Sequence, residues 1–253
     1  MNRKKIKVKM MFLLLSSFLF NLPTYVSAVE ATEVVLEFVE EFSNLADENQ
    51  KVAYLTFDDG PSIYTEALLD VLEEHDVSGI FFVLGKQFEY ISETDRLLNR
   101  MIEEGHYIGL HTMTHDKNAL YFSEKSPNVF RQEMLQLKDE IQVRTGYETL
   151  LCRAPYGKRG HFKLAHHKVV EDAGLYCVDW HIDSKDWAKQ HAGQIYDEVH
   201  AQLQAIGDQQ EIVLLFHEYQ RTVDAMPAII TLLQEEGYEI RPYVDGKVFD
   251  GLE

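Results

Sequence analysis

Short apolar runs alternate with amphipathic segments along the chain from Lys51 onward. The runs are rich in Val, Ile, Leu and Phe and end at turn or charged residues, which is typical of buried strands. They predict seven strands, at 52–57, 79–84, 107–110, 150–153, 175–180, 211–216 and 238–243. Between them, apolar residues recur at the spacing of one helical face and predict helices at 65–75, 94–104, 127–145, 163–173, 193–206 and 222–236.

Strands that alternate with helices of this length predict an α/β fold with parallel pairing, in a barrel or a doubly wound sheet. The sequence has no internal repeat and no low-complexity linker, so we expect one domain over 51–253. In both architectures the functional groups lie at the carboxyl ends of the strands. Polar residues at those positions are therefore the first candidates for chemistry.

The first 28 residues differ from the rest of the chain. They begin with five cations, continue with an apolar stretch of about eleven residues and end at Val26-Ser27-Ala28. This order predicts a secretory signal peptide at 1–28. The apolar stretch is shorter than the ~20 residues of a membrane span, although an uncleaved anchor stays an alternative. Residues 29–50 form an acidic lead-in segment before the domain.

The charge of the chain limits its partners. The chain carries 42 Asp and Glu against 24 Lys and Arg, a formal net charge of −18, and removal of the five cations in the predicted signal would leave −23. Such a surface repels nucleic acid and anionic lipid, so we expect neither as a partner. Two cysteines, Cys152 and Cys177, are too few for a disulfide scaffold, and a bridge and two buried thiols both stay open.

Polar residues follow five of the predicted strands, and in a parallel sheet they would converge on one face. These residues are Asp58, Asp59 and Gly60 after the first strand, His111 and His115 after the third, Arg153, Pro155 and Gly157 after the fourth, Asp183, Asp186 and Trp187 after the fifth, and His217 after the sixth.

Two histidines and a carboxylate predict a metal site. His111 and His115 are four positions apart, which brings two imidazoles to one side of a helical turn. A carboxylate from Asp58 or Asp59 would complete a set that leaves positions open for water and substrate, as in a catalytic zinc site. The other carboxylate would be free to take a proton from an activated water. Polar loop histidines and an Asp-Asp-Gly-Pro turn are the alternative interpretation.

Five segments, in this order, resemble the motifs of the polysaccharide deacetylases, which form carbohydrate esterase family 4 and share the NodB homology domain. The segments are Thr-Phe-Asp-Asp-Gly-Pro at 56–61, His-Thr-Met-Thr-His at 111–115, Arg-Ala-Pro-Tyr-Gly at 153–157, Asp-x-x-Asp-Trp at 183–187 and Leu-Phe-His at 215–217. The resemblance covers about 51–243 and implies a distorted (β/α)7 barrel of the polysaccharide deacetylase type, which agrees with the seven predicted strands.

The resemblance also implies a metal site and a base. Asp59, His111 and His115 would bind zinc or another divalent transition metal such as cobalt (Zn2+ or Co2+). Asp58 would be the general base that acts on the attacking water, and Arg153 would orient a catalytic carboxylate.

The remaining motif residues would act on the leaving group and the acetyl group. His217 would be the general acid that protonates the departing sugar amine, and Asp186 would hold it. The backbone N–H of Tyr156 would help to stabilise the oxyanion, a need of any amide hydrolase. Trp187 and Leu215 would line the acetyl pocket.

The implied function is a metal-dependent deacetylase of a cell-wall polysaccharide, with N-acetylglucosamine of peptidoglycan as the first substrate to expect. Chitin oligosaccharides, poly-N-acetylglucosamine and the O-acetyl groups of xylan are alternatives, since the same motifs serve them all. A wall-sugar-binding protein without turnover is the alternative of another class. A zinc peptidase is disfavoured because the chain has no His-Glu-x-x-His. We expect a secreted, wall-associated monomer without a membrane span after signal cleavage.

Overall fold

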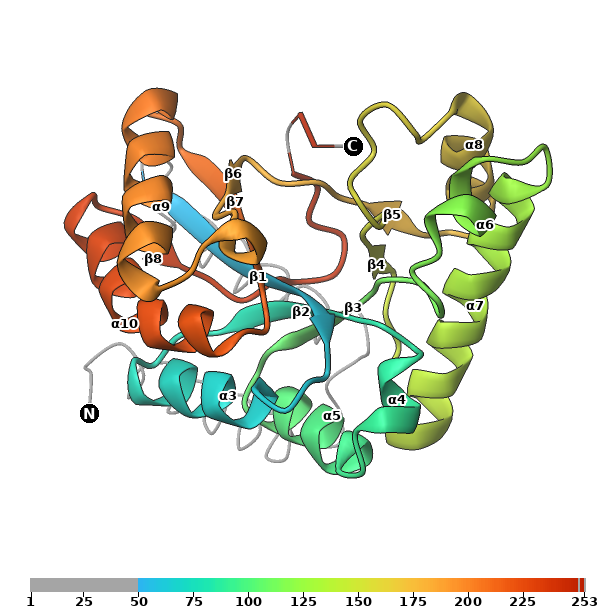
Figure 1. The fold of residues 1–253 in the computed structure, drawn as a ribbon, viewed down its shortest axis with the longest axis horizontal. Coiled ribbons are helices and arrows are strands. Elements are labelled where there is room, and N and C mark those ends of the chain that lie inside the picture. The colour runs from blue at the N-terminus through green and yellow to red at the C-terminus, as the bar shows by residue number, and fades with distance from the viewer. Residues whose placement is uncertain (1–49, 250, 253) are drawn as a thin grey trace, which may run out of the picture. The chain divides into compact units, whose positions relative to one another are not determined.

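The computed structural model describes residues 50–249 and 251–252, which fold around a parallel sheet (Figure 1). The strands are β1 (Val52–Gly60), β2 (Gly79–Val83), β3 (Tyr107–Leu110), β4 (Leu151–Cys152), β5 (Tyr176–Cys177), β6 (Ile182–Asp183), β7 (Glu211–His217) and β8 (Glu239–Ile240). They pair in the order β5-β4-β3-β2-β1-β7-β6, with β8 beside β1. The predicted signal peptide and nearly all of the acidic lead-in lie outside the described residues.

Helices cover the outer side of this sheet (Figure 1). They are α3 (Thr65–Glu74), α4 (Gln87–Tyr90), α5 (Thr94–Glu103), α6 (Lys117–Tyr121), α7 (Ser126–Thr145), α8 (Leu164–Asp172), α9 (Ala192–Ile206) and α10 (Gln220–Glu235), with a 3-10 turn at Asp186–Ala188. Among the described residues, no helix has both the length and the apolar character needed to cross a bilayer.

The predicted α/β fold is confirmed, as a half-barrel that is open between β5 and β6. All seven predicted strands and all six predicted helices are present, but β6, α4, α6 and the 3-10 turn were not predicted because they are too short to show a periodicity. Strands β4, β5 and β8 pair over only two residues each, fewer than the four to six predicted. The apolar runs there continue beyond the ladder, where Leu150 is already half exposed.

Alternate residues of β1 face two different cores, because successive side chains of a strand point to opposite faces. Leu55 belongs to the core between the sheet and the helices. Val52 and Tyr54 belong to a second core inside the half-barrel. Asp58 follows them at the same alternation, so its side chain points into the interior, where an apolar residue would be expected.

The carboxyl-terminal segment completes this interior core. Phe249 is fully buried, and its ring meets Tyr54 edge to face with centroids 4.9 Å apart. The carbonyl of Leu252 accepts hydrogen bonds from the backbone N–H of Asp179 and from the ammonium of Lys158. Figure 1 shows the segment passing between the β6–β7 side and the β4–β5 side of the sheet. It therefore fills the gap that the open barrel leaves.

We predict that Phe249→Ala destabilises the protein by about 3–5 kcal/mol, because it empties a fully buried position of the interior core. Urea unfolding followed by far-ultraviolet circular dichroism measures the change. Val244→Ala, at a position of the same segment that is 69% exposed, is the control and should cost about 0.5 kcal/mol or less. Equal stabilities of the two variants would show that the segment does not complete the core.

Candidate active site and metal centre

The candidate site lies at the carboxyl ends of four strands, on their interior side. The interior core residues of these strands are Tyr54 in β1, Tyr107 in β3, Leu151 in β4 and Val213 in β7. Asp58, His111, Arg153 and His217 lie two or four positions beyond them, so the alternation of each strand points its polar residue inward. Parallel strands present their carboxyl ends at one edge, and the structure brings these four side chains together there.

Asp59, His111 and His115 form a cluster with the spacing of a metal site. Asp59 Oδ1 lies 3.6 Å from His111 Nε2 and 3.5 Å from His115 Nε2. The same Oδ1 is buried and has no hydrogen-bond partner among the described residues. Burying a carboxylate oxygen without a partner is unfavourable in free energy, unless a cation pairs with it. Two imidazoles and one carboxylate fit a divalent transition metal.

Each histidine of this cluster uses Nδ1 for a bond within the protein. His111 Nδ1 donates to the carbonyl of Arg153 at 2.9 Å. The Tyr156 hydroxyl donates to the carbonyl of His115 and therefore accepts from His115 Nδ1, both at 3.1 Å. These bonds leave the lone pair on Nε2, toward Asp59. Burial lowers the pKa of His111 to about 3 and also lowers the pKa of His115, so both imidazoles are neutral, as metal ligands must be.

Asp58 lies against a fully buried arginine. Arg153 Nη1 donates to Asp58 Oδ1 at 2.9 Å and to Thr56 Oγ1 at 2.6 Å, and the other nitrogens donate to two backbone carbonyls. Burial raises the pKa of Asp58, and the charge of Arg153 opposes that rise. Asp58 Oδ2 lies 3.8 Å from His111 Nε2. One carboxylate oxygen is therefore held by the guanidinium, and the other faces the metal-site cluster.

His217 lies beside Asp58, in register across the β1–β7 pair. Its Nδ1 bonds to Asp186 Oδ1 at 2.8 Å, while Asp186 Oδ2 accepts from the backbone N–H of His217 and from the Thr222 hydroxyl. Burial lowers the pKa of His217, but the hydrogen bond and the charge of Asp186 outweigh burial and raise that pKa to about 9. The imidazole is therefore protonated at neutral pH and carries a proton on Nε2.

Known proteins share both the sequence and this fold. A family model described as polysaccharide deacetylase matches residues 46–178. The chain is 35% identical over 212 residues to YheN, a putative polysaccharide deacetylase of Bacillus subtilis. That match covers 83% of this chain and 72% of the relative. A peptidoglycan-N-acetylglucosamine deacetylase of Bacillus cereus is 35% identical over 207 residues, 79% of this chain and 72% of the relative. The chain belongs to the polysaccharide deacetylase family.

A solved structure of the family has the same architecture. The polysaccharide deacetylase Bc1974 from Bacillus cereus gives a TM-score of 0.71 at 34% sequence identity, over 79% of this chain and 95% of that chain. The distorted barrel that the motifs implied is therefore the fold of the described residues. The Asp/His cluster also agrees with the family, whose members are metalloenzymes.

The other family positions around the site differ in exposure. Trp187 and Tyr156 are 59% and 48% exposed, whereas Leu215 is buried. Leu215 precedes His217 by two positions in β7, so the two side chains share the interior face. Tyr156 has φ 65°, in the left-handed region, and Gly157 after it has φ 72°. This turn after β4 brings the Tyr156 ring against His115, with centroids 4.5 Å apart.

Three acids lie near the fourth motif, and only one of them bonds to His217. Asp186 does so through both carboxylate oxygens. Asp183 and Asp179 instead accept hydrogen bonds from backbone N–H groups of nearby loop residues. The geometry therefore supports Asp186, and neither of the other two acids, as the partner of His217.

Glu218 directly follows His217 in the chain, and its part in the site was not predicted from the sequence. Its Oε2 accepts hydrogen bonds from the backbone N–H of Ser62, at 3.0 Å, and from the Thr65 hydroxyl. A Cβ atom at Gly60 would lie 2.0 Å from Glu218 Oε1, so only glycine allows this approach. Burial raises the pKa of Glu218 to about 7. The side chain ties the Asp-Asp-Gly-Pro loop to the end of β7, and its adjacency to a strand-end histidine was the only sequence signal.

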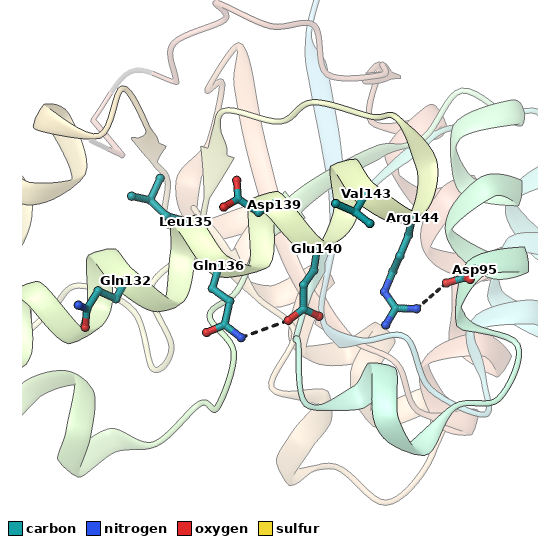
Figure 2. Close-up of a pocket in the computed structure, with 8 residues that line it drawn as sticks. All are labelled: Asp95, Gln132, Leu135, Gln136, Asp139, Glu140, Val143 and Arg144. Atoms are coloured by element: carbon teal, nitrogen blue, oxygen red, sulfur yellow. Dashed lines mark hydrogen bonds and ion pairs between the residues drawn. The ribbon is translucent and has the colours of Figure 1, made fainter.

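A surface hollow of about 910 Å³ lies on the outer side of α7 (Figure 2). Its lining residues are Asp95, Gln132, Leu135, Gln136, Asp139, Glu140, Val143 and Arg144. None of the candidate site residues lines it, and its charged pair of Arg144 with Asp95 is an ordinary surface contact. The hollow therefore has no part in the chemistry at the strand ends.

We predict that Asp186→Asn lowers the pKa of His217 by about 1–3 units, because burial then acts on the imidazole with much less opposition. The pKa would then lie at about 6–8, so a much larger share of the imidazole would be neutral near pH 7 and unable to donate the proton. An NMR titration of His217 in the metal-free protein measures the pKa. Asp183→Asn removes a nearby acid that does not bond to His217, and it should change the pKa much less. An equal fall in both variants would contradict the role of Asp186.

Proposed function

We propose that this protein is a metal-dependent deacetylase that removes N-acetyl groups from the N-acetylglucosamine of peptidoglycan. One observation carries the proposal: the buried carboxylate of Asp58 and the protonated imidazole of His217 lie side by side across β1 and β7, next to a candidate metal site. Amide hydrolysis needs a base for the water, an acid for the leaving amine and a stabilised oxyanion. The site has a candidate for each.

Asp59, His111 and His115 are the residues that we assign to the metal, and we propose zinc. Mixed nitrogen and oxygen donors suit zinc, and cobalt is the nearest alternative. A bound divalent ion would polarise the acetyl carbonyl and promote the ionisation of water. Three protein ligands leave a coordination position open, as a catalytic site requires.

Asp58 and His217 divide the proton transfers. Asp58 takes a proton from the attacking water on its Oδ2 side, since Arg153 holds the other oxygen. His217 then gives its Nε2 proton to the sugar nitrogen as the carbon–nitrogen bond breaks, and acetate and the free amine leave. Asp186 orients the imidazole and stabilises its charge. Each transfer of this kind contributes about 10²–10⁴-fold to the rate.

The acetyl group would sit between Tyr156 and the β7 side of the site. We assign the backbone N–H of Tyr156 to the oxyanion, because the left-handed turn places this residue beside His115. Trp187 and Leu215 form the apolar wall in this assignment, with the exposed indole covering the group from the solvent side.

The assignment of substrate and location rests on the relatives. The Bacillus cereus relative is named for the deacetylation of N-acetylglucosamine in peptidoglycan, and a wall polymer requires an enzyme outside the cell. The sequence pattern of 1–28 supports secretion by a signal peptide. We therefore propose a secreted, wall-associated monomer that keeps no membrane span once the signal is cleaved. Chitin oligosaccharides, poly-N-acetylglucosamine and acetylated xylan are the rival substrates.

Acetate release from peptidoglycan and from N-acetylglucosamine oligomers tests the proposal directly. We expect release by the purified protein, loss of release on chelation and recovery on addition of zinc, because the ligand set holds a removable ion. Faster release from xylan than from either amide substrate would instead indicate an O-acetyl esterase. Tight zinc binding without acetate from any substrate would contradict the proposal and favour a sugar-binding protein.

We expect Asp58→Asn to lower kcat by about 10²–10⁴-fold, because the amide cannot accept the proton from water. Asparagine keeps the shape of the side chain and an oxygen that accepts from Arg153, so zinc binding should persist. Acetate release and bound zinc are measured on the same preparation, and thermal unfolding checks that the variant is folded. Full activity of a folded Asp58→Asn protein would exclude Asp58 as the base.

A further inference from the structure

The loop between His111 and His115 has a backbone conformation that its residues rarely adopt. Thr112 has φ 70° and His115 has φ 59°, both in the left-handed region. This region is unfavourable for residues other than glycine, and most of all for a β-branched residue such as threonine. Because this backbone conformation is unfavourable by itself, contacts from outside the loop must stabilise it. The separation of the two imidazoles depends on the same turn.

A carboxylate from α7 makes those contacts. Glu133 Oε2 accepts from the backbone N–H groups of Met113, at 3.0 Å, and Thr114, at 2.9 Å. Both oxygens of Glu133 also accept from the Thr114 hydroxyl, at 2.9 and 3.1 Å. Hydrogen bonds to an ionised acceptor are shorter and stronger than those between neutral groups. One side chain thus holds two consecutive amides in the middle of the loop.

The turn after β2 holds the other side of the loop. The backbone N–H of Gly85 donates to the carbonyl of Thr112 at 3.0 Å, and that of Lys86 donates to the carbonyl of Met113 at 2.8 Å. Within the loop, the Thr112 hydroxyl accepts from the backbone N–H of His115 at 3.1 Å. The turn after β2 therefore holds the carbonyls of Thr112 and Met113, and Glu133 holds the amides of Met113 and Thr114.

We propose that Glu133 is a positioning residue of the metal site, which acts by holding the 111–115 loop so that His115 Nε2 faces Asp59. The inference rests on the proposed function only in that the Asp/His cluster binds a divalent metal. Glu133 contacts the backbone and the threonine hydroxyl between the ligands and does not itself complete the ligand set. Its effect is therefore on how strongly the metal binds.

The test is the zinc affinity of the full-length protein, measured by competition with a chromophoric chelator. Loss of a group that orients a ligand typically weakens metal binding about 10–100-fold, and we expect a loss of that size for Glu133→Ala. Glu133→Gln keeps one oxygen that accepts from both amides and should restore most of the affinity. Glu140→Ala is the matched control: Glu140 lies two turns further along α7 and bonds to Gln136 on the outer surface (Figure 2).

Further readouts separate positioning from a general loss of structure. If Glu133 acts by positioning, the metal-free Glu133→Ala protein unfolds at nearly the same temperature as the unmutated protein. Saturating zinc then restores kcat to within a few-fold of the unmutated value. Unchanged zinc affinity in Glu133→Ala would overturn the proposal. So would an equal loss in Glu140→Ala, or a metal-free protein that is already destabilised and is not rescued by glutamine. Zinc binding needs no substrate, so a failure to release acetate would contradict the proposed function and leave this test intact.

Discussion

The buried ion pair between Arg153 and Asp58 is the interaction on which the site depends. Burying two opposite charges costs more desolvation free energy than their attraction provides, unless their remaining polar atoms are also hydrogen-bonded. Here the guanidinium donates to Asp58, to Thr56 and to two carbonyls. Its Cζ also lies over two aromatic rings, 4.2 Å from the ring centroid of Phe82 and 5.6 Å from that of Trp180. The pair joins β1 to β4 across the interior, although two strands separate them in the sheet. Because the carbonyl of the same arginine orients His111, one residue sets the positions of both the candidate base and a candidate metal ligand.

The site contains two histidines whose pKa values are shifted in opposite directions, because only one of them has a carboxylate partner strong enough to outweigh burial. Burial is the largest influence on both His111 and His217, and it lowers the pKa in each case. The Nδ1 atom of His111 bonds to a neutral carbonyl, so burial prevails and that imidazole stays neutral. The Nδ1 atom of His217 bonds to the carboxylate of Asp186, which reverses the shift and keeps the imidazole charged. The partner of Nδ1 thus decides whether a buried imidazole stays neutral, as the candidate metal ligand His111 does, or charged, as the candidate acid His217 does.

The sequence predicted the parts of the fold and site that depend on local periodicity. Apolar runs located the strands, and the polar residues that end those runs located Asp58, His111, Arg153 and His217 on one edge. Contacts between segments far apart in the chain left no such signal: Glu133 lies in an ordinary amphipathic helix, and the hydroxyl of Tyr156 reaches His115 only because of a left-handed turn. The short extents of β4, β5 and β8 were also not predicted, because strand pairing is a contact between segments far apart in the chain and stops before the apolar runs do.

The carboxyl-terminal segment has a consequence for how the chain acquires its structure during synthesis. The interior core needs Tyr243, Phe249 and Leu252, yet the strands whose residues it covers are made much earlier. While the chain is still growing, Tyr54 and its neighbours have no partner from this segment, so the inner face of the sheet stays incompletely packed. The domain therefore reaches its final stability only after residues 243–252 have been made. An incomplete product would expose the same apolar face, which is the kind of surface that chaperones bind and proteases attack.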